Sequence, residues 1–248
     1  MPKLKIIIKG ETINLCQPTK KFAGGDIWYD WLNNPAMNLH LEKKYRKSKN
    51  TKEKQIEFFI NAKKNKRKIL IISTKNQIYK GVISLSKIDN VNKTCDISLL
   101  TDTKIEPLLA PYAGLEAMAL MSNYAFSNLK LKRVDCAFTL IQKSWQQRTE
   151  LLGYKHMFRS QYRAKTYSST WPLSMSDFEV DDINKAFYYT SLSYEDFKLL
   201  VKKRGKLWDS LSLMKRRISK LPRKTFYDIL NNFLDNDKKM YYDRILKL

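Results

Sequence analysis

The chain is poor in the residues that build disulfide, metal and nucleophile sites. It has three cysteines and two histidines in 248 residues. Three scattered cysteines are too few for a disulfide framework or a zinc site, so we predict neither. Cys95 and Cys136 lie in strand-like runs and are predicted to be small buried hydrophobic residues. A Ser–His–acid triad would need His40 or His156, and neither lies in a nucleophile-elbow sequence.

Long apolar runs are also missing. No run reaches the length of a membrane span, and the N-terminal segment turns polar too quickly for a signal peptide. There is no Walker or Rossmann glycine pattern for a nucleotide. Together with the scarcity of cysteine, these absences predict a cytoplasmic protein without a transmembrane segment.

Acidic residues are few relative to basic ones. The chain has 47 Lys and Arg against 24 Asp and Glu, a formal net charge of +23. Such a charge favours polyanionic partners, among them ligands with a diphosphate. A lysine-biased composition is the alternative explanation. Binding to nucleic acid or to another anionic surface stays open, although no RNA-recognition or zinc-finger pattern supports it.

What the chain does contain is typical of a globular fold, with 43% hydrophobic and 12% aromatic residues. Alternation of apolar and polar residues predicts strands, and apolar residues at helical spacing predict helices. Asp26 is expected to cap the first helix. The expected strands are residues 3–10, 68–73, 78–88, 94–100 and 131–139, and the expected helices are 27–33, 51–64, 143–152 and 193–203.

Residues 111–126, PYAGLEAMALMSNYAF, are the most informative stretch. A strand-like run precedes them, and Pro111 and Gly114 suggest a turn before a helix of good helix formers. The first N–H groups of a helix have no intrahelical partner, and the helix dipole adds partial positive charge there. This arrangement predicts a phosphate-binding turn. Glu116 is expected to serve the first turn of its own helix or a surface ion pair.

The order of these elements resembles the GNAT superfamily of N-acetyltransferases. Residues 30–42 (DWLNNPAMNLHLE) and 81–100 (GVISLSKIDNVNKTCDISLL) are similar to segments of one branch. That branch contains ribosomal-protein alanine acetyltransferases and surface-sugar N-acetyltransferases. PYAGLEAM is similar to its cofactor-binding turn, and Gly153-Tyr154 to its Gly-Phe pair. The resemblance covers about two thirds of the chain.

The resemblance implies an α+β fold with a mixed, mostly antiparallel central sheet flanked by helices. It implies a GNAT domain over residues 1–175. Beyond it we expect a helical, basic C-terminal extension over residues 176–248. This extension could pack on the core, pair two subunits as a homodimer, or dock on an anionic surface.

Acetyl-CoA is the co-substrate that the resemblance implies. The residues expected to contact it lie in two backbone segments and at one side-chain amide: Leu99, Leu100, Thr101, Tyr112, Ala113, Gly114, Leu115 and Gln142. In the family, a backbone N–H of a central strand polarises the thioester carbonyl. The resemblance places that N–H at residues 99–101 of this chain. Tyr112 departs from the family pattern because it stands where the first loop glycine is expected, so cofactor binding could be altered or lost.

Catalytic groups are less clearly marked. The resemblance places His40 and Glu42 in the acceptor-binding segment, where either could take a proton from the amine. The family's thiolate-protonating tyrosine is replaced by Thr149, and Ser144 is the nearest hydroxyl. Ser144 could equally be a helix cap.

The predicted function is transfer of acetyl from acetyl-CoA to a primary amine by direct attack. The acceptor expected from the branch is an amino sugar, linked to a nucleotide and used for a surface polysaccharide. One alternative is acetylation of a protein N-terminus, as in the ribosomal-protein relatives. Another is a GNAT-fold scaffold or binding protein that has lost turnover.

Overall fold

The computed structural model describes residues 4–34, 50–62, 64–102, 110–139, 149–150, 152–160 and 187–204. The chain divides into two compact units. One comprises Met1–Cys136 with Ser191–Lys198, and the other comprises Ala137–Thr190 with Leu199–Leu248. These two units do not test the domain boundary predicted at residue 175, which stays a prediction.

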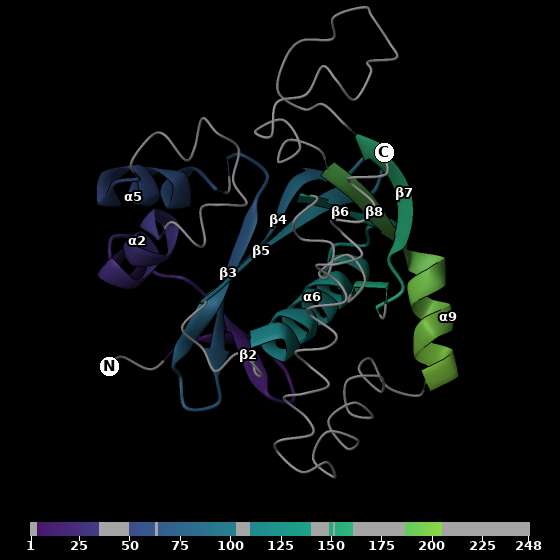
Figure 1. Ribbon diagram of the computed structural model, residues 1–248, viewed down its shortest axis with the longest axis horizontal. Helices are drawn as coiled ribbons and strands as arrows, with labels where there is room; N and C mark the ends of the chain where they lie inside the picture. Colours follow the sequence, from purple (N-terminus) through teal and green to yellow (C-terminus); the bar gives the residue numbers. More distant parts are fainter. Residues whose placement is uncertain are drawn as a thin grey trace, which may run out of the picture. The chain divides into compact units, whose positions relative to one another are not determined.

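The described strands form one mixed sheet of eight in the order β1-β2-β3-β4-β5-β6-β8-β7 (Figure 1). Strands β1 to β5 pair antiparallel in chain order, and β5 pairs with β6 parallel. The fold class predicted from the sequence is therefore confirmed. The strands are β1 (Ile6–Lys9), β2 (Ile13–Cys16), β3 (Lys68–Thr74), β4 (Tyr79–Asp89), β5 (Thr94–Thr101), β6 (Arg133–Thr139), β7 (Lys155–Ser160) and β8 (Phe187–Ser193).

Three short helices cover one face of the sheet in the first unit: α1 (Lys20–Ala23), α2 (Asp26–Asn33) and α5 (Lys52–Asn61). Alternate strand residues Ile69, Ile71 and Val82 share a buried cluster with residues of these helices. Phe22 stacks on Trp28, with ring centroids 5.6 Å apart. Asp26 does not cap α2 as expected. The N-cap is Gly25, and Asp26 begins the helix.

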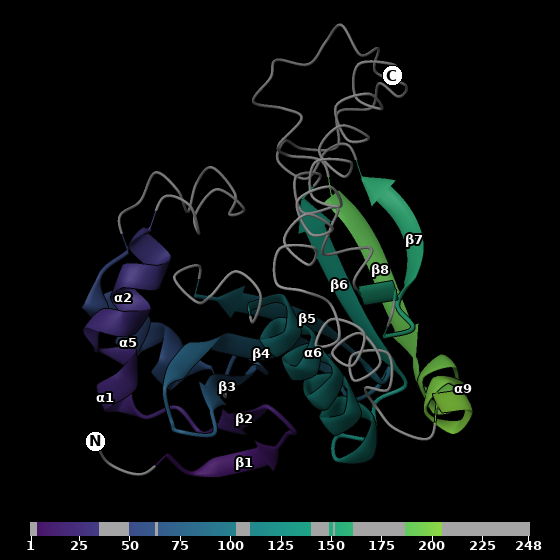
Figure 2. The same ribbon diagram turned by 60° about the horizontal axis from the view of Figure 1, so that its bottom comes forward.

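The opposite face of the sheet carries α6 (Ala110–Ser127), which packs against β2, β4 and β5 (Figure 2). Side chains alternate between the two faces of a strand. Leu70, Ile72, Ile83 and Leu85 therefore point to this side, and each is at most 1% exposed. The helix buries a broad apolar surface, since Leu115, Met118 and Met121 are also at most 1% exposed.

The expected turn at Gly114 is not present, because α6 already begins at Ala110. Proline is tolerated in the first turn of a helix, where its missing N–H would have no partner. A glycine in the helix interior costs roughly 1 kcal/mol relative to alanine, which the surrounding apolar helix formers offset. Pro111 and Gly114 are therefore helical residues.

Glu116 holds the β1–β2 turn onto α6. It is 4% exposed, and its carboxylate accepts from the Thr12 N–H at 3.0 Å, from the Thr12 hydroxyl and from the Glu11 N–H. A Cβ on Gly10 would lie 2.5 Å from this carboxylate, so the turn approaches too closely for a side chain. The expected role in its own helix turn or a surface pair was wrong.

The last described helix, α9 (Tyr194–Arg204), confirms the helix expected at 193–203. Ser193 accepts from the Asp196 N–H at 3.0 Å, which is the predicted cap. Within the first unit, Phe126 packs on Tyr194 and Phe197. The preceding residues differ from expectation, because β8 is a strand of the sheet where only helices were predicted.

The Glu116 contacts predict a large loss of stability in Glu116→Ala. Removing a buried carboxylate leaves backbone donors unpaired, so we expect a loss of about 3 kcal/mol in the free energy of unfolding. Urea denaturation measures it. Glu57→Ala, at an exposed position of α5, is the control and should change stability by less than about 0.5 kcal/mol. Equal effects of the two substitutions would contradict this role.

Candidate active site

The central feature of the candidate site is an early end to the pairing of β5 with β6. The parallel ladder joins Thr94–Asp96 to Arg133–Asp135. Strand β5 continues through Thr101, and on its other side it stays paired with β4 up to Gly81↔Thr101. Within the described ladder, residues 97–101 therefore have a partner strand on one edge and none on the other.

The hydrogen-bond pattern decides which backbone groups face this open edge. The Asp102 N–H donates to the Lys80 carbonyl at 2.9 Å, in register with the Gly81↔Thr101 pair. Residues of an antiparallel strand alternate between bonding the partner and pointing away from it. Leu100 thus bonds toward β4, whereas the N–H groups of Leu99 and Thr101 point to the open edge.

Gly81 fixes the position of this end of β5. A Cβ on Gly81 would lie 2.2 Å from the Leu100 carbonyl oxygen and 3.0 Å from the Thr101 Cα. The absence of a side chain therefore lets β4 lie tightly against 100–101. Gly81 was not predicted to be a site residue. A glycine inside a strand-like run often marks such a close backbone approach, so the signal was present.

The first turn of α6 supplies a second set of backbone donors. Strand β5 ends at Thr101 and α6 begins at Ala110, so a short connection leads from one to the other. The first N–H groups of a helix have no intrahelical partner. Here they belong to Ala110 and Tyr112, since Pro111 has no N–H. The side chain of Leu115 is buried at 1% exposure and is directed to the core.

Ala113 and Gly114 are also buried, and both lie beyond this first turn. Of the remaining predicted site residues, His40, Glu42, Gln142 and Ser144 lie outside the described part of the chain. Thr149 is fully buried, in the position that the resemblance assigns to the family's tyrosine.

The cysteines are not poised for nucleophilic chemistry. Cys16, Cys95 and Cys136 form no disulfide, and all three are buried. Their burial confirms the prediction for Cys95 and Cys136. Burial, reinforced by Asp96 and Asp135, raises the pKa of the Cys95 thiol to about 12. Burial also raises the pKa of the Cys16 thiol. A thiol with a raised pKa is protonated at neutral pH and is a poor nucleophile.

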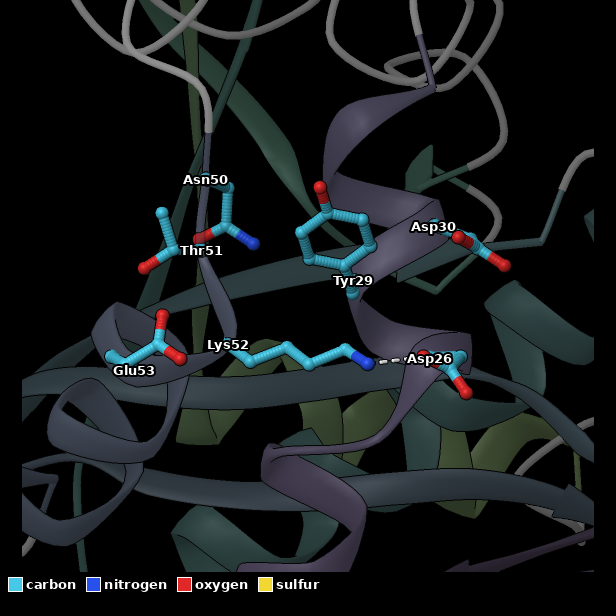
Figure 3. A pocket seen from close by; sticks show the side chains of 7 residues that line it. All are labelled: Asp26, Tyr29, Asp30, Asn50, Thr51, Lys52 and Glu53. Atoms are coloured by element: carbon cyan, nitrogen blue, oxygen red, sulfur yellow. Dashed lines mark hydrogen bonds and ion pairs between the residues drawn. The ribbon is translucent and has the colours of Figure 1, made fainter.

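A separate polar hollow of about 580 Å³ lies between α2 and the start of α5 (Figure 3). Lys52 forms an ion pair with Asp26 across it, which raises the pKa of Lys52. Hydrogen bonds from its own N–H and from Thr51 lower the pKa of Glu53. A carboxyl with a lowered pKa is a weaker base than an ordinary one, so Glu53 is a poor proton acceptor. It is lined by Asp26, Tyr29, Asp30, Asn50, Thr51, Lys52 and Glu53.

Next to this hollow, the side chain of Asn33 is hydrogen-bonded to the backbone of Asn50. Its amide donates to the Asn50 carbonyl at 3.2 Å and its carbonyl oxygen accepts from the Asn50 N–H at 3.1 Å. These two bonds hold together the ends of the segment that carries His40 and Glu42.

Two features are absent from the residues that the structure describes. No three His, Cys, Asp or Glu side chains gather in a way that could hold a metal ion. No helix is both long and apolar enough to cross a bilayer.

Solved structures of N-acetyltransferases share this fold. Spermidine N-acetyltransferase from Vibrio cholerae, in complex with CoA and spermine, aligns with a TM-score of 0.59 and 9% identity. The alignment covers 75% of this chain and 98% of that one. The microcin C7 self-immunity acetyltransferase MccE, in complex with acetyl-CoA and AMP, aligns with a TM-score of 0.55 and 18% identity. It covers 74% of this chain and 93% of that one.

No protein-family model matches the sequence, and no curated protein matches it either. At 9% and 18% identity, the likeness to the two structures establishes a shared fold. The chain therefore has the mixed sheet and flanking helices of GNAT acetyltransferases.

The alternation along β5 predicts different costs for proline at neighbouring positions. Leu100→Pro removes an N–H that bonds β4, whereas Leu99→Pro removes one at the open edge. We therefore expect Leu100→Pro to lower the free energy of unfolding by about 1–3 kcal/mol more than Leu99→Pro. Urea unfolding of both variants, with Leu99→Ala and Leu100→Ala as side-chain controls, measures the difference. An equal cost would show that the N–H directions are misassigned.

Proposed function

We propose that the protein is an acetyl-CoA-dependent N-acetyltransferase that acetylates a primary amine. The observation that supports this most strongly is the open edge of β5, where the N–H groups of Leu99 and Thr101 have no partner in the described ladder. The fold shared with N-acetyltransferases supports the proposal that this edge meets the cofactor. In such a site, an N–H donor polarises the thioester carbonyl.

The backbone donors present fit acetyl-CoA. The N–H groups of Ala110 and Tyr112, at the positive end of the α6 dipole, suit the diphosphate. The edge of β5 can bond the amide groups of an extended pantetheine arm, as it would bond another strand. Gln142 remains the predicted side-chain amide for the same arm. When bound, acetyl-CoA supplies an activated acetyl group as a thioester.

The reaction needs three things from the chain. The N–H of Leu100 is bonded to β4, so it is not available to the thioester. Of the two N–H groups at the open edge, we choose that of Leu99 to stabilise negative charge on the carbonyl oxygen. The incoming amine must lose a proton, for which His40 and Glu42 are the predicted bases. The departing thiolate must gain one, for which Ser144 is the predicted donor.

The net charge of the protein favours acceptors of opposite charge. With a net charge of +23, the protein repels a polycation such as spermine, which is bound by the Vibrio cholerae enzyme. It attracts an amine carried on an anionic group, because long-range fields raise the local concentration of opposite charge. We therefore propose a nucleotide-linked amino sugar as acceptor, ahead of a polyamine or the N-terminus of a basic protein.

Calorimetric titration with acetyl-CoA, followed by assay of free CoA against an acceptor panel, tests the proposal. The panel holds nucleotide-linked 4-amino sugars, spermidine and N-terminal peptides. We expect acetyl-CoA to bind and the amino sugars to be turned over with the highest kcat/KM. No binding would rule out both enzymatic functions and leave the scaffold alternative. Turnover of spermidine or peptides alone would rule out the amino sugar.

The role of Leu99 has its own test. Leu99→Pro removes the proposed N–H and should lower kcat by about 10²–10³-fold, the usual cost of one oxyanion donor. Leu99→Ala retains the N–H and should keep most of the activity. If both variants turn over equally, another donor polarises the thioester.

A further inference from the structure

The end of the sheet opposite the candidate active site carries a concentration of positive charge. Strand β3 begins there, β4 ends, and β5 and β6 begin, as the pairs Asp89↔Thr94 and Thr94↔Arg133 show. The residues flanking these strand ends form what we call the basic end. Its nine cationic residues are Lys64, Lys66, Arg67, Lys68, Lys87, Lys93, Lys130, Lys132 and Arg133.

The turns of the basic end are physically joined. The Ile88 N–H donates to the Lys66 carbonyl at 3.3 Å, and the Lys132 N–H donates to the Lys93 carbonyl at 2.7 Å. These bonds connect the segment before β3, the β4–β5 turn and the segment before β6. The turns that carry these cations therefore meet at one end of the first unit, although they come from three separate stretches of sequence. Two of the nine are partly engaged with the faces of the sheet, since Arg67 donates to the Ser84 hydroxyl and Lys68 lies over the Tyr124 ring.

Nearby acids neutralise only part of this charge. Asp96 pairs with Lys87 at 2.6 Å, and Asp135 pairs with Arg133 at 3.0 Å. Asp89 is occupied by its own turn, where it accepts from Asn92 and Val91, and these bonds lower its pKa. Glu195 and Asp196 lie close by, since the Tyr194 N–H donates to the Lys132 carbonyl. Nine cations against these five acids leave a clear positive excess.

The backbone of the turns provides a second, independent observation. Five described residues other than glycine have a positive φ, and four of them are lysines of the basic end: Lys66, Lys87, Lys93 and Lys130, at φ 49–57°. This left-handed conformation costs a residue with a Cβ roughly 1 kcal/mol and favours glycine or asparagine. Lysine has no conformational advantage there, so these turns carry positive charge at positions that backbone preference alone would give to glycine or asparagine.

We infer that the basic end is a binding surface for the phosphate backbone of nucleic acid. Lysines on turns present mobile point charges, which suit phosphate contacts without base recognition. An anionic bilayer fits less well, because Val91 is the one large hydrophobic side chain exposed on these described turns. The surface lies about eight strand residues, or roughly 25 Å, from Thr101. Nucleic acid could therefore be bound while the candidate active site is accessible.

The test uses the full chain and three of the left-handed lysines that have no acidic partner among the described ion pairs. Lys66→Asn, Lys93→Asn and Lys130→Asn are combined in one variant, because asparagine tolerates this conformation. A second variant has glycine at the same positions. The control removes three exposed lysines elsewhere with Lys9→Gln, Lys20→Gln and Lys54→Gln. Thermal melting should show that the asparagine and glycine variants are at least as stable as the natural chain.

Binding is measured by fluorescence anisotropy with a labelled single-stranded RNA of mixed sequence and about 25 nucleotides, over a range of KCl concentrations. We expect the turn variants to bind at least about tenfold more weakly, and the slope of log K against log salt to fall by about 2. The control should keep both values near those of the natural chain. Equal losses in the control, no RNA binding by the natural chain, or binding to phosphatidylserine vesicles in place of RNA would each overturn the inference.

Discussion

The early end of the β5–β6 ladder is the constraint on which the proposed chemistry depends. A backbone N–H or carbonyl needs a hydrogen-bond partner, and a strand inside a sheet normally finds one on both edges. Among the described strands, β5 has a partner on both edges only through Asp96. Beyond that point its outer edge can bond an extended ligand in the way that it would bond another strand. This is the edge on which we propose that an extended pantetheine arm binds.

Rigid packing around β5 makes the open edge usable. Gly81 lets β4 lie against the Leu100 carbonyl, and α6 covers one face of the same strand. Glu116 in turn ties α6 to the β1–β2 turn. The donors at Leu99 and Thr101 are thus held by the core of the first unit, and preorganised donors are the kind that stabilise developing charge well.

Much of this fold could be predicted from the sequence, because the strands carry strong apolar runs. Residues 68–73, 78–88 and 94–100 match β3, β4 and β5 within one residue or two. The prediction was wrong where local signals compete. Pro111 and Gly114 are typical of a turn, yet a proline in the first turn is compatible with a helix. Strand β8 depends on pairing within the sheet, which periodicity in a single segment cannot show.

The candidate site was predicted unevenly for similar reasons. The range 99–101 followed from a family resemblance, but only the observed register separates Leu99 and Thr101 from Leu100. Gly81 was missed because its effect is a contact with another strand. The catalytic side chains expected at 40, 42 and 144 stay predictions.

Amide chemical shifts on addition of acetyl-CoA test the central claim most directly. In ¹H–¹⁵N spectra of the full chain, we predict large changes for the N–H groups of Leu99 and Thr101, and a clearly smaller change for Leu100, which is bonded to β4. Changes confined to other parts of the chain, or a Leu100 shift as large as that of Leu99, would contradict the proposed use of the open edge of β5.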